Sequence, residues 1–213
     1  MRWSGRSGAR PWERGRLPVA PRLLALVGIL ALAFAGGAFL IGQQLAPSSA
    51  SRHPPKRAAS STSSELAQFQ DPAGAFTLSY PSSWQLLPPT DSQVLLLAAS
   101  GDGASLLVRK TPIGPELGTA AARKLADRVV RSGKNVTYLR APQEVRLGGL
   151  PGFLYLYTFD DPSTGARGAH AHYFLFQGTT MITLVFQALP ANRILSLASL
   201  FDRVAGTFRA LPG

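Results

Sequence analysis

Two histidines form the arrangement in this chain that is best suited to chemistry. His170 and His172 lie two residues apart in the largely apolar segment 169–176. Side chains of a β-strand alternate between its two faces, so both imidazoles are predicted to share one face. Two such imidazoles can chelate zinc or copper if each has a partner for its second ring nitrogen. The alternative is a half-exposed pair near a strand edge, hydrogen-bonded to backbone or water.

A metal site would need a third ligand, and the nearest acids are Asp160 and Asp161. In an antiparallel hairpin they lie beside the start of the histidine strand, so a carboxylate could reach the imidazoles. The sequence has no second H-x-H and no H-x-x-E pair. We therefore expect no metal and no cofactor, and His170 and His172 remain speculative ligand contacts. Asp160 and Asp161 are adjacent, so they fit the end of a strand better than an acid/base couple.

Other catalytic signatures are absent from the sequence. The chain has 0 cysteines, which excludes a disulfide scaffold, a thiolate zinc site, a cysteine nucleophile and a lipid-modified cysteine anchor. No G-x-S-x-G elbow, phosphate-binding P-loop or dinucleotide-binding glycine motif occurs. A non-catalytic protein is the favoured interpretation, and an enzyme whose site is assembled from dispersed residues is the alternative.

The elements that must position these residues follow from hydrophobic periodicity. Alternating or apolar runs predict β-strands, and apolar residues recurring every three to four positions predict helices. A predicted strand near 153–160 is apolar on both faces, which requires cover on both sides of its sheet. The fold class is therefore α+β, a mostly antiparallel sheet flanked by helices. The predicted strands are 76–80, 84–87, 94–99, 104–110, 136–140, 143–147, 153–160, 169–177 and 181–188, and the predicted helices are 117–132 and 191–208.

The segment from Leu23 to Gly42 predicts a membrane anchor. Its 20 residues carry no charge and no side-chain hydrogen-bonding group, and a helix of that length spans roughly 30 Å, the thickness of the hydrocarbon core. We expect a transmembrane helix over 23–45. A cleaved signal peptide is the alternative, although its apolar core is usually about 7–15 residues.

Charge predicts the orientation of that anchor. The chain has 22 Lys and Arg against 11 Asp and Glu; residues 1–64 hold 9 of the cations and 1 of the acids. Basic residues resist translocation, so the arm 1–22 is expected in the cytoplasm and the rest outside. A spacer rich in Ser, Pro and Ala, residues 46–64, is predicted to be disordered. It leads to an extracytoplasmic globular domain over 65–213, in the periplasm or on the cell surface.

The start of that domain resembles a known family. Residues 70–84, with Phe76, Tyr80, Pro81 and Trp84, are similar to the opening strand, turn and tryptophan of PsbP-like domains. The order of the later elements is also similar, so the resemblance covers about residues 66–210. It implies a sheet sandwiched between helices in an α/β/α arrangement. Members serve as photosystem accessory proteins, partner-binding modules or bacterial exported proteins, and the membrane tether departs from the soluble thylakoid members.

These observations predict a membrane-anchored accessory or binding module with an envelope protein as partner. The basic set Arg123, Lys124, Arg128 and Arg131 on the first predicted helix could dock an acidic partner; a solvated helix face is the alternative. Basic and aromatic residues do not interleave there as in single-strand nucleic-acid platforms, so no nucleic acid is expected. A membrane signalling subunit is a further alternative, and a small-molecule ligand is left open.

Overall fold

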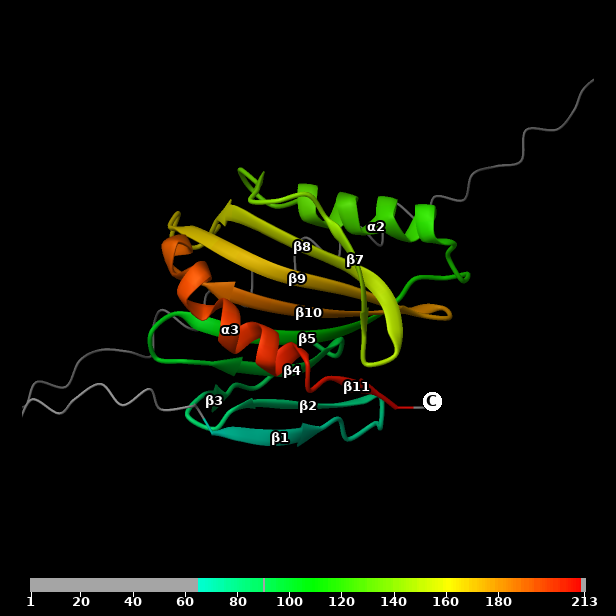
Figure 1. The fold of residues 1–213 in the computed structure, drawn as a ribbon, viewed down its shortest axis with the longest axis horizontal. Coiled ribbons are helices and arrows are strands. Elements are labelled where there is room, and N and C mark those ends of the chain that lie inside the picture. The colour runs from blue at the N-terminus through cyan, green and yellow to red at the C-terminus, as the bar shows by residue number, and fades with distance from the viewer. Residues whose placement is uncertain (1–64, 90, 212–213) are drawn as a thin grey trace, which may run out of the picture.

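The computed structural model describes residues 65–89 and 91–211, which form an α+β fold with two antiparallel sheets and two α-helices (Figure 1). The arm 1–22, the predicted anchor from Leu23 to Gly42 and the spacer 46–64 lie outside the described residues. None of the described helices is both long and apolar enough to cross a bilayer.

The main sheet has eight strands in the order β3-β4-β5-β10-β9-β8-β6, and β7 also pairs with β8. Every pairing in it is antiparallel, as the short predicted connections required. Most predicted strands are confirmed within two or three residues. The strands are β3 (Gln85–Leu86), β4 (Val94–Ala99), β5 (Ala104–Pro112), β6 (Thr137–Tyr138), β7 (Gln143–Leu147), β8 (Leu150–Asp160), β9 (Arg167–Gln177) and β10 (Thr180–Ala188).

The turn between β7 and β8 has a clear local cause. Leu147 pairs with Leu150, so only Gly148 and Gly149 connect the two strands. Both glycines have positive φ, 58° and 87°. Two-residue hairpin turns of this kind match the right-handed twist of their strands and favour glycine at both positions.

The alternation along β8 separates two hydrophobic cores. Phe153 and Tyr155 point toward α2 (Thr119–Arg131), whereas Leu154 points toward α3 (Ile194–Ala205). We call these two sides of the main sheet the α2 face and the α3 face. The prediction that both faces are apolar and packed is confirmed along this strand.

A second sheet was not predicted. It has three strands in the order β1 (Leu66–Gln70), β2 (Phe76–Pro81) and β11 (Arg209–Ala210), all antiparallel. Phe76 and Phe208 are fully buried and stack at 5.7 Å between ring centroids. The prediction of one helix over 191–208 was therefore too long, because α3 ends at Ala205 and Phe208 belongs to the turn that leads into β11.

Candidate functional site

Tyr157, His170 and His172 form a buried polar cluster on the α2 face. Tyr157 lies on β8 and both histidines lie on β9, where Tyr157 pairs directly with His170. The Tyr157 hydroxyl is 3.0 Å from Nδ1 of His170 and 3.2 Å from Nδ1 of His172. Nε2 of His170 is 3.0 Å from Oε1 of Gln187 on β10. The cluster therefore connects three neighbouring strands through side chains as well as backbone.

The prediction that the two histidines share one face is correct, but the half-exposed position at a strand edge is wrong. His170 is 5% exposed and His172 is 0% exposed. The reason is topological: β9 is an interior strand between β8 and β10. Aromatic rings enclose the pair, with Phe174 stacked at 3.8 Å from His172 and Phe159 at 4.1 Å from His170, centroid to centroid.

Burial keeps both imidazoles neutral near neutral pH. It lowers the pKa of His170 to about 4, although the hydrogen bond with Gln187 acts in the opposite direction. It lowers the pKa of His172 well below its ordinary value, and it raises that of Tyr157 above the usual range. Burying a neutral polar side chain costs less free energy than burying its charged form.

The neutral state fixes the direction of the hydrogen bonds. Oε1 of Gln187 can only accept, so Nε2 of the neutral His170 carries the proton and donates to it. Nδ1 of His170 then carries a lone pair and accepts from the Tyr157 hydroxyl. The Tyr157 oxygen is then free to accept from the Nδ1 proton of His172. This assignment follows from hydrogen-bond complementarity. It commits Nδ1 of both histidines to one hydroxyl group.

The two acids considered as a possible third metal ligand are engaged elsewhere. Oδ1 of Asp161 accepts four hydrogen bonds from the backbone and hydroxyl groups of Ser163 and Thr164. Burial raises the pKa of Asp161, but these hydrogen bonds outweigh it and hold the pKa below its ordinary value. Within 65–89 and 91–211, no three His, Cys, Asp or Glu residues are grouped so that they could hold a metal ion.

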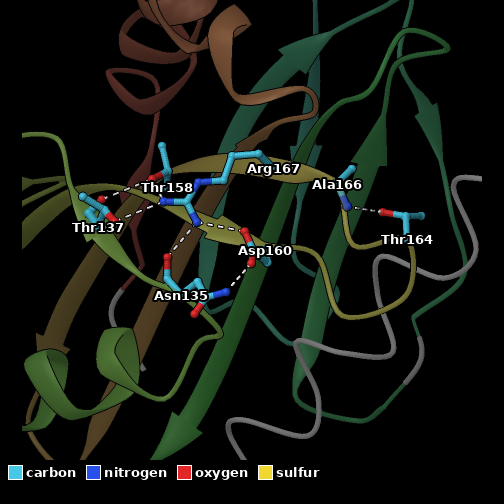
Figure 2. Close-up of polar contacts among 7 residues, drawn as sticks. All are labelled: Asn135, Thr137, Thr158, Asp160, Thr164, Ala166 and Arg167. Atoms are coloured by element: carbon cyan, nitrogen blue, oxygen red, sulfur yellow. Dashed lines mark hydrogen bonds and ion pairs between the residues drawn. The ribbon is translucent and has the colours of Figure 1, made fainter.

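Asp160 belongs to an exposed polar cluster at the end of the β8–β9 hairpin (Figure 2). One guanidinium nitrogen of Arg167 donates to Oδ1 of Asp160 at 2.9 Å and to the Asn135 carbonyl at 2.7 Å. The other donates to the hydroxyls of Thr137 and Thr158. Hydrogen bonds from Asn135 and Arg167 lower the pKa of Asp160. The interpretation of Asp160 as the end of a strand is correct, since β8 ends there.

A basic surface covers α2 and the segment that follows it. Within residues 119–146 there are seven cations against two acids, and all seven cations are exposed. One of the acids, Asp127, accepts a hydrogen bond from Tyr155 of β8 at 2.9 Å. We define the basic surface as Arg123, Lys124, Arg128, Arg131, Lys134 and Arg146. The first four were singled out from the sequence, and Lys134 in the loop after α2 and Arg146 on β7 were not. The seventh cation, Arg140, lies close enough to Tyr173 of the α3-face core to influence the pKa of that residue.

The ion pairs of the described residues all lie outside this surface. They join Arg109 to Asp91, Arg167 to Asp160 and Arg193 to Asp102. Outside residues 119–146, the charged residues of the domain 65–213 are six cations and eight acids. The excess positive charge of the domain is therefore concentrated in residues 119–146, a feature that the order of charges in the sequence already contains.

A groove opens beside the first turn of α2. Its volume is about 350 Å³, and it lies between α2, β7 and β8. Leu117, Val145, Phe153 and Phe176 provide an apolar lining, and Thr119, Glu144 and Arg146 provide polar groups. Arg123 lies one helical turn beyond Thr119, on the same side of α2. The groove is thus bordered by cations of the basic surface.

Comparison with solved structures identifies the fold. The solution structure of cyanobacterial PsbP (CyanoP) from Synechocystis sp. PCC 6803 is similar, with a TM-score of 0.53 and 14% identity over 74% of this chain and 99% of that chain. LpqN, involved in cell envelope biogenesis of Mycobacterium tuberculosis, gives a TM-score of 0.54 and 12% identity over 70% and 91%. The Saccharomyces cerevisiae Ran-binding protein Mog1p gives 0.50 and 12% identity over 70% and 96%.

At these identities the likeness shows the fold alone. The PsbP-like fold implied by the sequence resemblance is thereby confirmed. No family model matches the chain, and no curated protein is detectably similar in sequence. The neighbours are described as a cyanobacterial PsbP, a protein involved in cell envelope biogenesis and a Ran-binding protein, so the fold alone does not define a function.

Proposed function

We propose that this chain is a single-pass membrane protein whose extracytoplasmic domain is a non-catalytic module that binds an envelope protein. One observation carries the proposal: the imidazoles are buried and hydrogen-bonded within the core, whereas the cations of α2 and of the segment that follows it are exposed. Groups suited to acid–base chemistry need access to substrate. Groups suited to recognition need access to a partner, and the basic surface has it.

The fold comparisons support a binding role. Mog1p is described as Ran-binding and LpqN as involved in envelope biogenesis. The anchor and the orientation rest on the apolar segment from Leu23 to Gly42 and on the charge difference across it. A tethered domain meets its partner at a high effective concentration, so a modest interface is sufficient for binding.

Placement is tested by protease treatment of intact spheroplasts that carry the full chain with a tag at each end. Protease should remove the domain 65–213 and leave the cytoplasmic arm protected. A domain that stays intact until lysis would show that the orientation is wrong. A mature N-terminus near Ser51 would replace the anchor with a cleaved signal peptide.

Partner binding is tested by crosslinking native membranes that contain the full chain, followed by purification under denaturing conditions. The control is the chain truncated after residue 64, which keeps the arm, anchor and spacer. A membrane protein crosslinked to the full chain and absent from the control supports the module. A variant that lacks residues 2–16 keeps the domain and the anchor. If it crosslinks to the same partner but no longer transmits a signal to the cytoplasm, the chain is instead a signalling subunit.

A further inference from the structure

We propose that the basic surface and the adjoining groove bind an acidic protein segment that carries an apolar side chain. This inference rests on the proposed function, because it names the chemistry of the partner that the module binds. It combines three observations: the charge of the surface, the apolar lining of the groove beside it, and the position of both on the domain.

The charge of the surface selects an anionic partner. Arg123, Lys124 and Arg128 are exposed on α2. None of them takes part in an ion pair within the described residues, so their charges face solvent and can contact a partner. Seven cations and two acids in residues 119–146 give a net charge of +5. Complementary charge speeds association and excludes partners of the same sign.

The groove adds a requirement for an apolar side chain. Phe153 and Phe176 lie at 76° to each other with ring centroids 6.2 Å apart, and both line the groove. A volume of about 350 Å³ accommodates an aromatic or branched side chain. Buried apolar anchors inside a polar rim are the usual energetic centre of protein interfaces.

The position of the surface favours a protein over the lipid bilayer. In Figure 1 the described chain begins at β1 on one side of the molecule, and α2 lies on the opposite side. The spacer joins the domain at β1, so α2 and its four cations lie on the side of the domain away from the point of attachment. A bilayer would also provide no reason for an aromatic-lined groove among the cations.

The probe for this inference is a short fluorescent peptide of Asp and Glu around a central Phe-Leu pair. Its binding to the full chain in nonionic detergent is measured by anisotropy at low ionic strength. Two control peptides have Ser-Ser in place of Phe-Leu, or Lys in place of every acid. We expect the acidic Phe-Leu peptide to bind most tightly, the Ser-Ser peptide about tenfold more weakly, and the Lys peptide not to bind.

Matched variants locate the binding. Arg123→Glu/Lys124→Glu should weaken the acidic peptide at least about tenfold. Arg203→Glu/Arg209→Glu changes the net charge equally at exposed positions on and after α3, and it should leave affinity within about twofold. All four side chains are exposed, but Arg209 also donates to the carbonyls of Gly206 and Phe208, so circular dichroism that matches the parent chain is required of both variants.

Three outcomes would overturn the inference. Equal weakening by both double variants would show attraction by net charge alone, and absence of peptide binding would show that the surface does not select acidic segments. In a parallel arm, the chain is tested with anionic phosphatidylglycerol vesicles and neutral phosphatidylcholine vesicles. Anionic vesicle binding that is lost in Arg123→Glu/Lys124→Glu, without peptide binding, would assign the surface to lipid. A crosslinked partner found on native membranes would leave the proposed function standing in each case.

Discussion

Two polar clusters join the same pair of strands, β8 and β9, but they differ in burial and in charge. The buried cluster of Tyr157, His170 and His172 is uncharged and enclosed by aromatic rings. The exposed cluster around Arg167 and Asp160 is charged and open to solvent (Figure 2). In the core a charge is costly, so neutral donors and acceptors are matched; at the surface water screens the charges.

The difference predicts that the two clusters affect stability under different conditions. The buried cluster should dominate the response to pH and to removal of a single hydroxyl. The exposed cluster should contribute less, and its contribution should fall with added salt. Stability is measured on the full chain in nonionic detergent, by urea unfolding followed with far-ultraviolet circular dichroism.

The largest expected effect is a loss of stability in mild acid. The folded pKa of His170, about 4, lies below the ordinary value of 6.5, so the unfolded chain takes up the proton first. Stability is therefore complete above about pH 6.5 and falls until the pH reaches about 4, by about 3 kcal/mol for this group. His172, whose pKa is also lowered by burial, increases the loss.

The control for acid sensitivity is the double variant His170→Gln/His172→Gln. It removes both titrating groups, so its stability should change little over the same pH interval, whatever its stability at neutral pH. Asp102, Asp160 and Asp161 have lowered pKa values, and the stability that they contribute is lost only below their ordinary value of 3.8. A double variant as acid-sensitive as the parent would assign the effect to other groups.

How far the sequence predicted these features depends on the range of the interactions involved. Strand alternation is local, so it placed both histidines on one face and opposed Phe153 to Leu154 correctly. Strand pairing is not local: β9 is an interior strand because it pairs with both β8 and β10, and Tyr157 lies opposite His170 because of the β8–β9 register. The half-exposed position was wrong for that reason.

The small sheet and the basic surface were missed for related reasons. β11 has two residues, and only its pairing with β2, far away in sequence, makes it a strand. Lys134 and Arg146 follow no single period, because Lys134 lies in the loop after α2 and Arg146 lies on β7. Periodicity finds residues that share an element, whereas these cations share only a surface.

The second prediction removes the hydroxyl that both histidines share. Tyr157→Phe should lower the free energy of unfolding by about 1–3 kcal/mol, because it leaves buried ring nitrogens without their common partner. The matched control is Tyr173→Phe on the α3 face, where the residue is 7% exposed and no hydrogen bond of its hydroxyl is found among the described residues. The control should change stability by less than about 0.5 kcal/mol. Equal losses from both variants would show that the Tyr157 hydroxyl has no special role.

The smallest expected effect concerns the exposed cluster. Arg167→Gln removes the guanidinium that contacts Asp160, Asn135, Thr137 and Thr158. The side chain of Arg167 is 40% exposed, so water replaces much of what is lost, and the decrease in stability should be less than half of that caused by Tyr157→Phe. The decrease should shrink further in about 1 M salt, where the Debye length is about 3 Å. The effect of Tyr157→Phe should not change with salt, because its partners are neutral and buried. A loss from Arg167→Gln that equals the Tyr157 effect and resists salt would mean that solvent does not screen this cluster, and the contrast between the two would fail.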